Sequence, residues 1–91
     1  MQREDLDFLK LVIFVYFNSS LNQNSYSKKI FCYLAHEELK TNQQTISKYL
    51  GCNISKVRAY KRNITSLLRA NDEVLLNDLE QIKKLLNNGK R

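Results

Sequence analysis

The chain has 91 residues, a formal net charge of +6 and two cysteines. This length allows one domain with a single modest core, and a positive charge favours a polyanionic partner. Cys32 and Cys52 are too few and too far apart for a disulfide framework or a zinc site, so we expect no metal. The sequence also shows no sign of a cofactor or of a small-molecule ligand, and we expect neither.

The longest apolar run in the sequence, Leu11 to Phe17, has seven residues. A membrane-spanning helix needs about 18 or more. Three acids, Glu4, Asp5 and Asp7, precede this run where a signal peptide would carry basic residues. We therefore expect a reduced cytoplasmic protein with no membrane partner.

Charge is concentrated in the middle third of the sequence. Seven lysines and arginines and no acid lie between Leu39 and Asn71, whereas the rest of the chain has a net charge of −1. A surface adapted only for solubility would mix both signs. We interpret this segment as a surface that faces phosphates.

The absence of proline and the presence of only two glycines predict long helices, and so an all-α domain of four to five helices over residues 1–91. The first element, from Asp5 to about Phe17, is apolar enough to form either a helix or a strand. Its early acids and the lack of a partner strand favour a helix. Because it is apolar on every side, it should be central or covered by a second subunit.

The next helix is predicted from about Tyr26 to Glu37, after a polar loop at residues 18–24. Its helical spacing predicts that Ile30, Phe31 and Leu34 are buried, together with Tyr33 or Ala35.

A pair of short helices joined at a tight corner is predicted between Thr41 and Leu68. Thr41 and Gln44 have the spacing of a capping box, and Gly51 provides the positive φ that ends the first helix. Small Ser47 suits the closest approach of the two helices, and Asn53 is a strong N-cap for the second. Inward positions on the two helices carry Ile46, Leu50, Val57 and Tyr60, and Ile54 is expected to be partly inward.

This pattern resembles the DNA-binding helix-turn-helix of bacterial and phage regulators. With the preceding helix, it also resembles the start of a winged-helix domain, in which Leu39 to Thr41 would replace the first short strand. Cys52 and Ser47 depart from the aliphatic residue and the alanine that are commoner at their positions, and no clear glycine-turned wing follows. The resemblance implies sequence-specific binding of double-stranded DNA by a transcriptional regulator, or by an accessory protein of a phage, plasmid or conjugation origin.

Helical spacing separates the second helix of the corner into an apolar sector and an outward sector of small and basic residues. By the resemblance, four positions reach bases: Ile54, Ser55, Arg58 and Ala59. Four basic side chains are expected to bind phosphates: Lys56, Lys61, Arg62 and Arg69. Gln43 or Gln44 of the first helix would contact the DNA backbone across the groove.

A last helix is predicted over residues 71–88, with Asn71 as its cap and Gly89 at its stop. Its apolar residues Leu75, Leu79, Ile82 and Leu86 form a seam that packs on the core or pairs with a second copy. A short hairpin turning at Asn77-Asp78 would instead make a wing, but the regular spacing of the seam favours the helix.

No combination of residues for catalysis is recognisable. The one histidine, His36, lacks a second ligand or partner base, so we expect a non-enzymatic protein. A homodimer is compatible with this interpretation, because a single DNA-binding unit buries little surface. The alternative function is a protein-interaction module that binds a partner through the Leu75–Leu86 seam.

Overall fold

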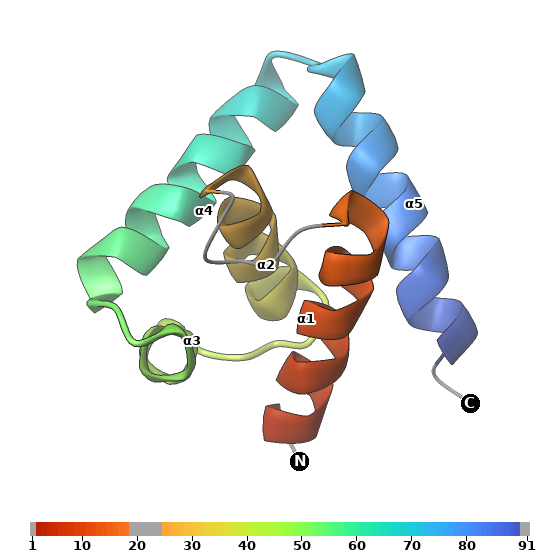
Figure 1. Cartoon of the computed structure of the whole chain (residues 1–91). Coiled ribbons are helices and arrows are strands. Elements are labelled where there is room, and N and C mark those ends of the chain that lie inside the picture. Colours follow the sequence, from red (N-terminus) through yellow and green to blue (C-terminus); the bar gives the residue numbers. More distant parts are fainter. Residues whose placement is uncertain (1, 19–24, 90–91) are drawn as a thin grey trace.

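The computed structural model describes residues 2–18 and 25–89 of the chain (Figure 1). This part of the chain contains five helices and no strand. The helices are α1 (Gln2–Phe17), α2 (Ser25–Glu37), α3 (Gln43–Leu50), α4 (Ile54–Arg69) and α5 (Glu73–Gly89). The predicted all-α class is confirmed. The predicted polar loop at residues 18–24 falls, beyond Asn18, outside the described residues.

The apolar first segment forms helix α1 and not a strand, as predicted. Leu6, Leu9 and Ile13 recur at helical spacing and are buried. Leu11 and Phe14, on the opposite side, stay exposed. Within the single chain, α1 is therefore covered on one face only.

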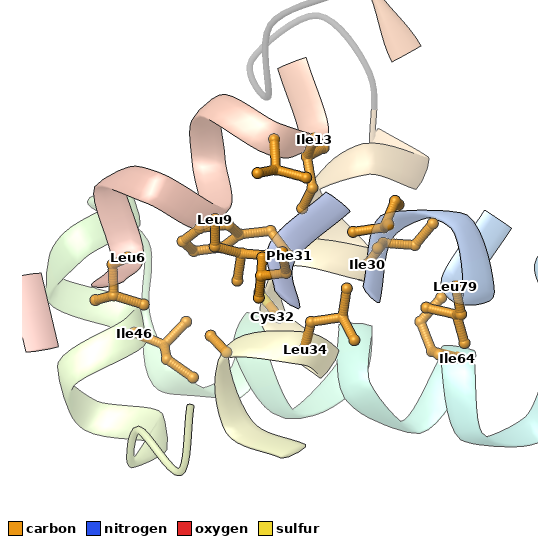
Figure 2. Packing of buried hydrophobic residues seen from close by; sticks show 14 of the residues in the cluster. Leu6, Leu9, Ile13, Ile30, Phe31, Cys32, Leu34, Ile46, Ile64 and Leu79 are labelled. Carbon is orange, nitrogen blue, oxygen red and sulfur yellow. The ribbon is translucent and has the colours of Figure 1, made fainter. Parts of the chain in front are cut away.

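Helix α2 supplies the centre of the core. It packs against α1, α3 and α4, and the side chains of Ile30, Phe31, Leu34 and Ala35 are buried as predicted, whereas Tyr33 is half-buried. Figure 2 shows Phe31 and Leu34 among side chains that converge from α1, α3, α4 and α5. The fold is thus a shell of helices around one central helix.

Cys32 is part of this core and is fully buried. Burial raises the pKa of its thiol to about 12, so the group stays protonated and behaves as a small apolar side chain. Cys52 is only partly buried, and both cysteines are free thiols. Cys32 is therefore a structural residue of the core.

A shared carboxylate joins three helices at one end of the bundle. The Tyr16 hydroxyl donates a hydrogen bond to Asp78 Oδ1 at 2.7 Å, and the Tyr26 hydroxyl donates one to Asp78 Oδ2 at 2.9 Å. The hydrogen bond to Asp78 is the main cause that raises the pKa of Tyr16 to about 12, and burial is the main cause that raises the pKa of Tyr26. Asp78 on α5 therefore holds the end of α1 next to the start of α2.

Replacing Tyr16 by phenylalanine should lower the free energy of unfolding by about 1 kcal/mol at neutral pH, because a hydrogen bond to a carboxylate is lost. The Tyr16 pKa is raised on folding, so its stabilisation is present below the unfolded value of 10.0 and is lost as the pH rises through about 12. Urea unfolding across this range should therefore show a smaller alkaline loss for Tyr16→Phe than for wild type. Equal stability and equal alkaline loss would contradict this role of Tyr16.

Helix α5 lays the predicted Leu75–Leu86 seam on the core. Leu75 and Ile82 are fully buried, and Leu79 and Leu86 are 5% and 3% exposed. The helix runs unbroken through Asn77 and Asp78, so the alternative of a hairpin wing at this position is wrong. The seam packs within its own chain because regular helical spacing brings all four side chains to the face that meets α1 and α4.

The predicted cap of α5 is off by one residue. Asp72, and not Asn71, accepts a hydrogen bond from the backbone N–H of Leu75 at 2.9 Å. Asn71 has a left-handed φ of 56° and ends α4, since this turn lets the Asp72 N–H donate to the Leu67 carbonyl at 3.1 Å. One asparagine cannot adopt this turn and also the extended backbone of an N-cap.

Leu79→Asp should unfold the protein or lower its free energy of unfolding by at least about 3 kcal/mol, because a charge would be buried without a partner. Leu76→Asp is the matched control on the same helix, since Leu76 is 44% exposed. Thermal unfolding followed by circular dichroism measures both variants. If Leu79→Asp melts at the wild-type temperature, α5 does not pack as described.

Candidate nucleic-acid interface

Helix α3, the turn at residues 51–53 and helix α4 form a corner, which we call the α3–α4 corner. The N-cap of α3, the first helix of the corner, differs from the prediction. Asn42 is the N-cap of α3 and its side chain accepts from the Thr45 N–H at 2.8 Å, so the predicted capping box of Thr41 with Gln44 is wrong. Thr41 is fully buried, and its own N–H donates to the Ala35 carbonyl at 3.0 Å, which keeps it at the end of α2.

The turn of the corner forms as predicted. Gly51 has a φ of 71° and a ψ of 30°, and its N–H donates to the Lys48 carbonyl at 3.3 Å. Asn53 caps α4 by accepting from the Lys56 N–H at 3.0 Å. Small Ser47 is buried, and its hydroxyl donates to the Gln44 carbonyl at 2.7 Å. These local contacts fix where α4 starts relative to α3.

Tyr49 attaches α3 to the rest of the bundle. Its ring stacks on Phe31 of α2, with the ring centroids 5.6 Å apart. Its hydroxyl donates to the carboxylate of Asp7 on α1. The orientation of the α3–α4 corner is therefore tied to both α1 and α2.

Helix α4 has the two predicted sectors. Val57 and Ile64 are fully buried, and Tyr60, Leu67 and Leu68 are half-buried against the core. The outward sector is exposed along the whole helix, from its first turn to its last: Ser55, Arg58, Ala59, Arg62, Ser66 and Arg69. Helix α4 carries five basic residues and no acid.

A shallow hollow of about 310 Å³ lies along this sector and reaches the start of α3. No acidic side chain lines it. We call it the α4 hollow, and its lining residues are Gln43, Arg58, Lys61, Arg62, Thr65, Ser66 and Arg69. Four cationic groups and three neutral polar side chains thus line a single concave surface.

Two side-chain contacts hold cationic groups at the hollow. Arg58 Nε donates to Gln43 Oε1 at 3.1 Å, which links α4 to α3. Lys61 Nζ lies 3.0 Å from His36 Nδ1 at the end of α2. Because a lysine ammonium can only donate, this contact requires a neutral His36 ring whose proton is on Nε2. Glu37 Oε2 lies 3.4 Å from the same Nδ1 and could accept a hydrogen bond only from a ring that carries a proton on Nδ1.

The structure brings together only part of the predicted DNA-contact set. Gln43, Arg58, Lys61, Arg62 and Arg69 line the α4 hollow. The other five predicted residues lie outside it, with Ile54 half-buried and the rest exposed: Gln44, Ile54, Ser55, Lys56 and Ala59. Ser55 and Ala59 still share the outward sector with Arg58.

Two lining residues were not among the predicted contacts. Thr65 follows Lys61 by four positions and Ser66 follows Arg62 by four, so helical spacing alone places both beside the cationic groups. The Thr65 hydroxyl already donates to the Lys61 carbonyl at 2.9 Å. The contact of His36 with Lys61 spans 25 positions and has no signal in the local sequence.

No group of three or more histidine, cysteine, aspartate or glutamate side chains could hold a metal ion within residues 2–18 and 25–89. Within the same ranges, no helix is long and apolar enough to cross a membrane. Comparisons with protein-family models, with curated proteins and with solved structures found no match.

Gly51→Ala should lower the free energy of unfolding by about 1 kcal/mol, because alanine disfavours the left-handed backbone of this turn. Nothing lies within 4 Å of an added Cβ, so the cost is conformational and not steric. Gly51→Asn should recover part of the loss, since asparagine tolerates this conformation. Chemical denaturation of the three proteins measures the difference, and an alanine variant as stable as wild type would contradict the turn.

Proposed function

We propose that the protein binds double-stranded DNA through the outward sector of α4. The observation that carries this proposal is the α4 hollow, in which Arg58, Lys61, Arg62 and Arg69 face one surface and no acidic side chain lines it. DNA phosphates attract such a surface strongly, and counterions are released when lysine and arginine neutralise them. An ordinary solvated helix face would mix both charges.

The start of α4 is the part suited to base contact. Ser55 and Ala59 are small and exposed, so the helix can approach the edges of bases closely in a major groove. Arg58 lies between them in sequence, and its contact with Gln43 restrains its direction. We assign base recognition to this turn, with Arg58 as the principal donor.

The later turns of α4 are suited to the DNA backbone. Lys61, Arg62 and Arg69 extend the positive surface along the helix, and Thr65 and Ser66 add hydroxyl groups between them. From Arg58 to Arg69 this surface is about 16 Å long at the usual rise of a helix. We assign phosphate contact to these residues, and to exposed Gln44 and the start of α3 on the other side.

We further propose a role as a transcriptional regulator or as a DNA-binding accessory protein of a phage, plasmid or conjugative element. The resemblance of the α3–α4 corner sequence to the helix-turn-helix of bacterial and phage regulators supports this assignment. The corner has the short turn, the two side-chain caps and the positively charged second helix that such a unit needs.

The alternative, a protein-interaction module that uses the Leu75–Leu86 seam, receives no support from the packing. All four seam side chains are at most 5% exposed. A partner could reach them only if α5 left the core. The seam therefore favours a structural role over a binding role.

Arg62→Ala should weaken binding to all duplexes to a similar degree and should reduce the slope of log affinity against log salt by about 1, because one phosphate contact is lost. Arg58→Ala should instead cost about 1–3 kcal/mol on the preferred sequence and relax base preference. Fluorescence anisotropy with a duplex selected from a random library, beside a scrambled duplex, measures both effects at several salt concentrations.

Lys84→Ala is the matched control for these variants. It removes one positive charge from α5, where Lys84 is exposed and lies 4.0 Å from Glu80. Affinity and salt slope should stay at the wild-type values if the position of the charge matters more than its total. Equal losses for Arg62→Ala and Lys84→Ala, or salt-independent binding, would contradict the proposed interface.

A further inference from the structure

The exposed large hydrophobic side chains are confined to two helices. Among the described residues there are six, all on α1 or α5 and none on α2, α3 or α4: Leu11, Phe14, Val15, Val74, Leu76 and Leu85. A surface with scattered apolar residues would place some on every helix. This segregation indicates a dedicated apolar surface.

The three residues on α1 form one stripe. Leu11, Phe14 and Val15 are spaced by three and four positions, and they lie opposite the buried face that contains Leu9 and Ile13. Their exposed fractions are 56%, 45% and 63%. The stripe accounts for the apolar character of α1 on the side that its own chain leaves uncovered.

Two exposed residues on α5 lie on the flank of that helix that carries Asp78. Helices α1 and α5 pack against each other, and Asp78 accepts a hydrogen bond from Tyr16. Val74 precedes Asp78 by one helical turn and Leu85 follows it by two, so both share the flank of α5 whose Asp78 is bonded to α1. We call Leu11, Phe14, Val15, Val74 and Leu85 the α1–α5 patch.

Leu76 lies on the other flank of α5. That flank also carries Lys83, which pairs with Glu38 at the end of α2 at 3.7 Å. Leu76 is thus exposed to a similar extent as Leu85 but is separate from the α1–α5 patch.

The charges of the helices favour a second copy of the chain as the occupant of the patch. Helices α1 and α5 each carry two basic and three acidic residues, so their surface is nearly balanced, whereas α3 and α4 together carry six basic residues and no acid. Two copies that met through their α3–α4 corners would repel each other. Two copies that met through α1 and α5 would bury apolar side chains at little electrostatic cost.

We propose that the α1–α5 patch is the interface of a homodimer, in which a second copy of this chain binds the same patch about a two-fold axis. A stable interface buries about 800 Å² per partner, roughly one seventh of the 5829 Å² accessible surface of the chain. The outer faces of α1 and α5 would have to provide this area. This proposal extends beyond DNA binding and does not depend on it.

The position of the patch leaves the α4 hollow open. In Figure 1, α1 and α5 lie on one side of the molecule, whereas α3 and the outer face of α4 lie on the other. A dimer formed through α1 and α5 therefore keeps both copies of the hollow accessible. Two such surfaces on one particle would raise the affinity for a duplex without any new contact.

The test is the mass of the full chain in solution over a wide range of concentration, by sedimentation equilibrium without DNA. Wild type should reach twice its 10.7 kDa mass at high concentration and dissociate on dilution. Leu11→Glu should raise the dissociation constant at least about tenfold. Val15→Lys, of the opposite charge and on the same stripe, should do the same.

Leu76→Glu is the matched control and should leave the dissociation constant unchanged. Circular dichroism confirms that each variant is folded. Arg62→Ala should weaken DNA binding and leave the mass unchanged, which separates the proposed dimer from the proposed DNA interface. A wild type that stays at 10.7 kDa at every concentration would overturn the dimer. Equal effects of Leu11→Glu and Leu76→Glu would overturn the assignment of the patch.

Discussion

Burial of α2 on several sides is the constraint from which the other helices take their positions. Helix α2 packs against α1, α3 and α4. Within about one and a half turns it buries four side chains: Ile30, Phe31, Leu34 and Ala35. One helix can satisfy this many neighbours only if they surround it. Figure 2 shows the consequence, because side chains from α1 and α5, at the two ends of the sequence, belong to one core with those of α2.

This central packing also determines which face of α4 is exposed to solvent. Val57 and Ile64 hold one face of α4 on the core, so the opposite face, with all of its arginines, must point to solvent. Tyr49 fixes α3 against Phe31 and Asp7, and Gln43 of α3 then reaches Arg58. The cationic hollow is thus a result of core packing and not of attraction among its four cationic residues, which repel each other.

The sequence predicted what depends on helical spacing and failed where tertiary contacts decide. Helical periodicity located the buried seam of α5 and the two sectors of α4, and the residue types at Gly51 and Asn53 predicted the turn between α3 and α4. The cap of α3 moved from Thr41 to Asn42 because Thr41 is held by the Ala35 carbonyl. The neighbours of Lys61 across the fold could not be found in the local sequence.

A nuclear magnetic resonance titration of the labelled protein with a short duplex shows which residues DNA approaches. If the outward sector of α4 binds DNA, the largest shifts occur at Arg58, Arg62, Ser66 and Arg69 of α4 and at Gln43 of α3. Resonances of the Leu75–Leu86 seam should stay near their free positions. Shifts confined to α1 and α5, or none at a saturating duplex concentration, would contradict binding through α4.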